Sequence, residues 1–146
     1  IEQAITTHAS IAEAAVVGIP DALKGHLPFA FVTLATHPHP DPAVPDERLL
    51  SEVQKLVREQ IGGIASLGGI IQGKGMIPKT RSGKTLRRVL RELLENATHA
   101  EFNKEVNVPS TIEDREAVSV AREKVREYFE VKGKDLHKAT EVRAKL

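Results

Sequence analysis

The stretch Pro78–Thr85, PKTRSGKT, holds the residues of this sequence that are best suited to chemistry. It ends in Ser-Gly-Lys-Thr, as a phosphate-binding P-loop does. A P-loop also needs a glycine five positions before the glycine of that motif, and Pro78 stands there. Proline has no amide hydrogen to offer a phosphate and cannot adopt the dihedral angles of glycine. The stretch is therefore not a P-loop.

A similar loop, Gly68–Lys74, has both the first glycine and the Gly-Lys pair. Gly75 follows it, where a P-loop needs a serine or threonine to bind magnesium. This second stretch is therefore not a P-loop either.

A second interpretation is a basic surface for nucleic acid or an acidic partner. Six cations fall within thirteen residues: Lys79, Arg81, Lys84, Arg87, Arg88 and Arg91. Such a cluster can bind phosphates. However, no aromatic residue for base stacking interleaves with it, and the whole chain has a net charge of only +1. A free-standing interaction module stays open as the alternative, as does an ordinary solvated surface.

A third interpretation is that the loop presents a single lysine. Gly83 permits a tight bend, and Thr85 could cap a helix that follows. Lys84 would then precede a helix N-terminus, whose dipole disfavours a cation. A loop of this kind suits an anion that comes from outside the domain.

Other candidates for chemistry are weaker. His37 and His39 lie close together in a proline-rich loop without a third metal ligand, so no metal site is predicted. The carboxylates Glu2, Glu13 and Asp21 are scattered, which favours surface positions over acid–base pairs.

The composition indicates one globular domain with an aliphatic core. The chain has 146 residues, of which 40% are hydrophobic and 3% aromatic, and it has no cysteine. No apolar run reaches the roughly 18–20 residues that span a bilayer, so no membrane partner is expected. Because the chain begins with Ile1 and has Met76 as its single methionine, we expect it to be a piece of a longer protein.

The alternation of helices and strands indicates an α/β or α+β fold with a small sheet of three to four strands flanked by helices, and we predict α+β. Strands are expected at 12–21, at 27–34 and within 68–75. Helices are expected to end after Ile5, to run from the cap Asp46 to Gly62, to begin near Leu86, and to follow a capping box at Ser110–Glu113. Residues 1–130 form the predicted domain. Residues 131–146 form a basic tail that we expect to be flexible or to fold on a partner.

Three segments resemble a known family: 9–34 (ASIAEAAVVGIPDALKGHLPFAFVTL), 57–63 (VREQIGG) and 78–93 (PKTRSGKTLRRVLREL). They are similar to the C-terminal domain of AMP-forming acyl-CoA synthetases, which are adenylate-forming enzymes, and most of all to the acetyl- and propionyl-CoA synthetases. The resemblance covers about residues 1–120, and its Pro-Lys-Thr-Arg-Ser-Gly-Lys motif is highly specific. The family's hinge and large N-terminal domain would lie upstream of Ile1.

The resemblance implies two half-reactions. A carboxylic acid first attacks ATP, with Mg²⁺, to give acyl-AMP and pyrophosphate, and after the C-terminal domain rotates, coenzyme A forms the thioester. By this match Lys84 is the catalytic lysine of adenylation. Arg58 matches a position that contacts coenzyme A, and Arg81 is a second candidate cofactor-binding residue.

The resemblance also implies the partners. The N-terminal domain of the same chain would hold most of the ATP, Mg²⁺ and coenzyme A as well as the small carboxylic acid, and this fragment alone is expected to be inactive. Lys84 would be a substrate for an acetyltransferase and a deacetylase. A nucleic-acid partner is not expected, and the location is expected to be cytoplasmic or mitochondrial. Acetate and propionate are the acids that the family suggests.

Overall fold

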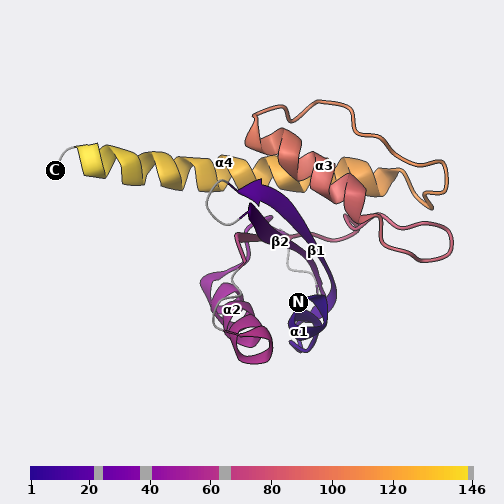
Figure 1. Ribbon diagram of the computed structural model, residues 1–146, viewed down its shortest axis with the longest axis horizontal. Helices are drawn as coiled ribbons and strands as arrows, with labels where there is room; N and C mark the ends of the chain where they lie inside the picture. The colour runs from indigo at the N-terminus through magenta and orange to yellow at the C-terminus, as the bar shows by residue number, and fades with distance from the viewer. Residues whose placement is uncertain (22–24, 37–40, 63–66, 145–146) are drawn as a thin grey trace.

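The computed structural model describes residues 1–21, 25–36, 41–62 and 67–144. Its elements, in chain order, are α1 (Glu2–Thr6), β1 (Ile11–Asp21), β2 (Gly25–Leu34), α2 (Glu47–Ile61), β3 (Gly69–Gln72), α3 (Arg87–Thr98) and α4 (Glu116–Ala144). Figure 1 shows these elements along the chain.

The sheet has three strands in the order β1-β2-β3. β1 and β2 pair antiparallel as a hairpin, whereas β2 and β3 pair parallel, with α2 in the connection between them. A parallel pair needs a crossover of this kind. The predicted α+β class with a small sheet is confirmed.

Helices cover both faces of the sheet, which makes three layers (Figure 1). One core lies between the sheet and the helices α3 and α4, and it includes Ala15, Val17, Phe31, Leu90 and Val125. The other lies between the sheet and the helices α1 and α2, and it includes Ile5, Val32, Val53, Val57 and Ile70. β1 and β2 therefore contribute to both cores, with alternate residues on opposite faces.

A bulge in β1 changes which face its residues occupy. The pairing of β1 with β2 shifts between Ile11, opposite Leu34, and Glu13, opposite Thr33. Ile11 packs in the core of α1 and α2, whereas Ala15 packs in the core of α3 and α4. Because regular alternation would leave both odd-numbered residues on one face, the bulge is what separates them.

α2 forms as its sequence predicts. Asp46 caps it, with Oδ1 accepting a hydrogen bond of 2.8 Å from the backbone N–H of Leu49. Leu49, Val53 and Val57 are buried, as the helical spacing predicts. The helix ends at Gly62.

Two predicted caps are wrong. α3 begins at Arg87 with Leu86 at the N-cap position and no side-chain capping bond, so Thr85, which pairs with Lys79, lies one residue too early to cap it. Ser110–Glu113 is not the start of a helix, because Ile112 pairs with Thr80 and α4 begins only at Glu116.

α4 continues to Ala144, past the predicted domain boundary at residue 130. In Figure 1 its C-terminal part extends beyond the sheet. The division into a domain of residues 1–130 and a tail of residues 131–146 stays a prediction. Over the described residues, no helix is long and apolar enough to cross a membrane.

Candidate functional site

Residues Lys79 to Thr85 form a small hairpin ahead of α3. Lys79 and Thr85 face each other across an antiparallel bridge. The backbone N–H of Leu86 donates to the carbonyl of Pro78 (2.9 Å), and that of Thr80 donates to the carbonyl of Lys84 (2.8 Å). The loop that carries Lys84 thus has a defined backbone.

The turn of the hairpin is closed by backbone and side-chain bonds. The N–H of Gly83 donates to the carbonyl of Thr80 (2.8 Å), and Gly83 has a φ of +90°. The Thr80 hydroxyl oxygen accepts from the N–H of Lys84 (3.1 Å) and lies 2.9 Å from that of Ser82. The requirement for glycine at position 83 is conformational, since positive φ favours glycine.

Residues 111–113 pair with the first strand of this hairpin. Thr80 pairs with Ile112, which is buried. The N–H of Arg81 donates to the carbonyl of Thr111 (3.1 Å), and the N–H of Glu113 donates to that of Lys79 (2.8 Å). The hairpin is therefore held by a chain segment that lies about thirty residues further along the sequence.

Two cations of the basic stretch have carboxylate partners. Lys79 Nζ lies 2.7 Å from Glu13 Oε1, on β1. Arg87 donates from Nε to Oε2 of Glu2 on α1 (2.8 Å) and from Nη2 to Oε1 (2.5 Å). Hydrogen bonding to Arg87 lowers the pKa of the Glu2 carboxyl below its usual value. The sequence gives no signal for either pair, because the partners are more than sixty residues apart.

The ammonium of Lys84, unlike Lys79 and Arg87, has no carboxylate partner among the described residues. Its side chain is exposed, and it makes no ion pair or hydrogen bond with any described residue. Arg81, two positions earlier on the turn, is likewise exposed. The hairpin therefore fixes its backbone while it leaves the Lys84 ammonium available to an external anion.

Arg58, the candidate contact for coenzyme A, lies on α2 and not on the hairpin. It is exposed near the C-terminal end of α2, where its carbonyl accepts from the N–H of Gly62 at 3.0 Å. Because α2 and α3 pack on opposite faces of the sheet, the structure does not bring Arg58 together with Lys84 (Figure 1). The two candidate residues belong to different surfaces of the domain.

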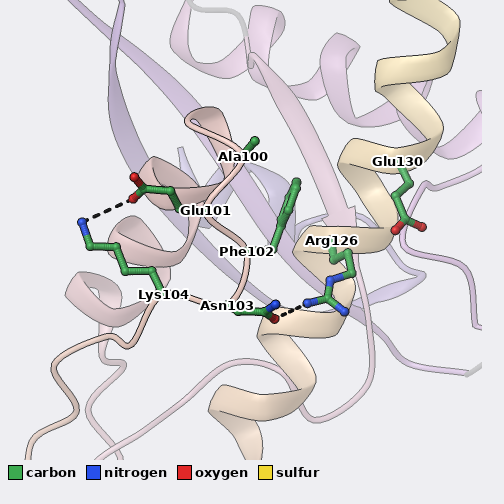
Figure 2. Close-up of a pocket in the computed structure, with 7 residues that line it drawn as sticks. All are labelled: Ala100, Glu101, Phe102, Asn103, Lys104, Arg126 and Glu130. Carbon is green, nitrogen blue, oxygen red and sulfur yellow. Dashed lines mark hydrogen bonds and ion pairs between the residues drawn. The ribbon is translucent and has the colours of Figure 1, made fainter.

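A hollow of about 720 Å³ lies between residues 100–104, which follow α3, and the residues Arg126 and Glu130 of α4. Figure 2 shows two interactions among the side chains that line it: an ion pair between Lys104 and Glu101, and a hydrogen bond that Arg126 donates to Asn103. None of Lys84, Arg81 and Arg58 lines it. We therefore take the hairpin as the candidate site and not this hollow.

The predicted absence of a metal site is not decided by the structure. Within the described residues there is no group of three or more His, Asp or Glu side chains that could hold a metal ion. His37 and His39 lie outside the described residues.

The model of the family described as "AMP-binding enzyme C-terminal domain" matches residues 1–84, which is more than half of the chain and ends at Lys84. The chain belongs to this family. An uncharacterised protein of Pseudomonas aeruginosa is 40% identical over 78% of the chain, and the acetyl-coenzyme A synthetases of Magnetococcus marinus and Salmonella typhi are 47% and 44% identical over 64% and 67%. The chain spans 16%, 14% and 14% of these relatives, respectively.

Solved structures agree with this membership. A Brucella canis acyl-CoA synthetase matches with a TM-score of 0.58 and 32% identity, over 66% of this chain and 17% of its own. An acetoacetyl-CoA synthetase from Streptomyces lividans matches with a TM-score of 0.63 over 87% of this chain and 17% of its own; at 24% identity it supports the fold alone. The curated relatives named above are bacterial, which gives no support to a mitochondrial location.

Proposed function

We propose that this chain is the mobile C-terminal domain of a short-chain acyl-CoA ligase, which activates acetate or propionate as acyl-AMP and then forms the coenzyme A thioester. One observation carries the proposal. The chain belongs to the family of AMP-binding enzyme C-terminal domains, and its hairpin presents Lys84 exposed and without a partner among the described residues. The named acetyl-coenzyme A synthetases support the choice of a short-chain acid. A cytoplasmic location remains a prediction.

In the adenylation step Lys84 would bring two anions together. A carboxylate and the α-phosphate of ATP repel each other, and an ammonium placed between them offsets this repulsion as negative charge shifts in the transition state. A lysine already neutralised by an internal carboxylate would serve this purpose poorly. The absence of an ion pair at Lys84 among the described residues therefore suits the role.

The other ligands are assigned mainly to the N-terminal domain. Mg²⁺ is assigned with ATP to that larger domain because the resemblance to AMP-forming acyl-CoA synthetases implies it. Arg58 would contact coenzyme A, with Arg81 as a second cofactor-binding residue on the hairpin. Because Arg58 and Lys84 occupy different faces, rotation of the domain about a hinge would present them in turn.

The test is Lys84→Ala in the full-length ligase, measured separately in the two half-reactions. Acid-dependent exchange of pyrophosphate into ATP should fall by about 10²–10³-fold, the usual cost of one such electrostatic contact. Thioester formation from preformed acyl-adenylate should largely persist. Equal losses in both half-reactions would contradict the assigned role.

Lys74→Ala is the matched control. Lys74 is also exposed and also follows a glycine in a loop, but it lies outside the hairpin. Its substitution should leave pyrophosphate exchange unchanged. If both alanine variants lose exchange equally, a general loss of surface charge explains the result and not a specific lysine.

The same exposure makes Lys84 accessible to modification. We propose that an acetyltransferase and a deacetylase act on it, because acetylation would remove the charge that adenylation needs. Acetylation of Lys84 should then reproduce the half-reaction pattern of Lys84→Ala. Mass spectrometry of the isolated ligase, together with the exchange assay, checks this expectation.

A further inference from the structure

The bulge in β1 determines where the side chain of Glu13 lies. After the bulge the alternate residues Ala15 and Val17 pack toward α3 and α4, and Glu13 is in phase with them. Before it, Ile11 packs toward α1 and α2. One extra residue in the strand thus turns Glu13 to the face on which the hairpin and α3 lie.

On that face Glu13 forms an ion pair with Lys79. The Lys79 ammonium lies 2.7 Å from Glu13 Oε1, and the two side chains are 35% and 33% exposed. Lys79 is the residue that pairs with Thr85 across the hairpin, next to Lys84. The ion pair therefore joins the base of the hairpin to the central sheet.

The first strand of the hairpin is thus held in two different ways. The segment at Ile112 holds it through backbone hydrogen bonds to Lys79 and Arg81, whereas β1 holds it through the Glu13 side chain. Backbone bonds of this kind do not depend on which side chain is present. The contact with β1 can therefore be removed without disturbing them.

We propose that Glu13 is a positioning residue for Lys84, which it orients through Lys79. This inference rests on the proposed function of Lys84. Catalysis by a positioned ammonium depends on its placement, and a displacement of about 1 Å can cost on the order of a hundredfold in rate. The ion pair also offsets the charge of Lys79, so that Lys84 is the lysine of the hairpin without a carboxylate partner among the described residues.

The experiment compares Glu13→Gln with the unaltered full-length ligase. Glutamine keeps the size of the side chain and removes the charge that holds Lys79. We expect kcat for pyrophosphate exchange to fall about three- to fivefold, the effect of one partly exposed ion pair. The KM values for ATP and the acid should change less than twofold, and thioester formation from preformed acyl-adenylate should be unaffected.

Glu101→Gln serves as the control for loss of an ion pair elsewhere. Glu101 pairs with Lys104 at 3.3 Å, away from the hairpin, and its substitution should leave both half-reactions unchanged. The exchanged pair, Glu13→Lys with Lys79→Glu, should recover at least half of the lost exchange rate. That recovery would show that the ion pair itself matters. A merely structural role would lower both half-reactions together, so the comparison of the two half-reactions separates it from positioning.

Two outcomes would overturn the inference: an exchange rate in Glu13→Gln equal to that of the unaltered ligase, or equal losses in both half-reactions. Lys84→Ala measured in the same assay separates this inference from the proposed function. If Lys84→Ala abolishes exchange and Glu13→Gln does not affect it, the role of Glu13 alone is refuted. If Lys84→Ala itself retains exchange, the proposed function is refuted as well.

Discussion

Gly83 gives the sharpest test of how the hairpin places Lys84. Its φ of +90° lies in the left-handed region, and a Cβ added to it would meet no atom within 4 Å. Gly83→Ala therefore creates no clash, and its cost is conformational. A non-glycine residue in this region costs about 1–2 kcal/mol, so we expect the free energy of unfolding to fall by about that amount.

Other substitutions should follow the same conformational order. Asparagine tolerates positive φ better than alanine, so Gly83→Asn should cost less. Valine, branched at Cβ, should cost more. Thermal unfolding of the 146-residue chain should show Tm falling in the order Asn, Ala, Val, by about 2–4 °C per kcal/mol for a domain near this size.

Gly75→Ala is the matched control for function. Gly75 has a φ of +70°, and a Cβ there would also meet no atom within 4 Å, so the loss of stability should be similar. Gly83 differs because its N–H closes the turn to Thr80 and because Lys84 follows it. In the proposed full-length ligase only the Gly83 variants should therefore lower pyrophosphate exchange.

The reasoning would be refuted by either of two results. If Gly83→Ala is as stable as the unaltered chain, the positive φ does not determine the choice of glycine. If Gly75→Ala reduces pyrophosphate exchange as much as Gly83→Ala does, lost stability and not lysine placement accounts for the effect.

Two further predictions concern charged residues. Arg58→Ala in the full-length ligase should raise the KM for coenzyme A and leave pyrophosphate exchange intact; an unchanged KM would make Arg58 an ordinary solvated helix residue. The Arg87 hydrogen bond lowers the pKa of Glu2 below 4.5, so the stability that this pair contributes is present above pH 4.5 and is lost as the pH falls below it. Acid titration of unfolding should therefore show a shallower loss of stability below pH 4.5 for Arg87→Met than for Arg88→Met, and parallel curves would count against the pair.

The sequence predicts well the elements that depend on local patterns. The helical spacing of Val89, Leu90, Leu93 and Leu94 predicts the buried face of α3, and Asp46 predicts the start of α2. These signals lie within one or two turns of the chain. The motif around Lys84 is equally local, so the family could be identified from it.

The errors arise where distant segments meet. Ser110–Glu113 has the pattern of a capping box, but its backbone N–H and carbonyl groups bond to the hairpin instead, and Ile112 is buried. The error at Thr85 is more local: Thr85 pairs with Lys79 within the hairpin, and the N-cap of α3 is Leu86. A capping pattern states what a residue can do locally, and tertiary pairing determines whether it does so.

The electrostatics of the site show why this distinction matters for function. From the sequence, the stretch from Lys79 to Arg91 is a uniform patch of cations, and Glu2 and Glu13 are unrelated surface carboxylates. In the structure these two carboxylates pair with Arg87 and Lys79, which lie on either side of Lys84 along the chain. The pairs reduce repulsion within the patch and fasten the hairpin at its base and the first turn of α3. The two ion pairs lie on both sides of Lys84 along the chain, and neither includes the Lys84 ammonium. They therefore hold the loop in place while the charge of Lys84 stays available to an anion from outside the domain.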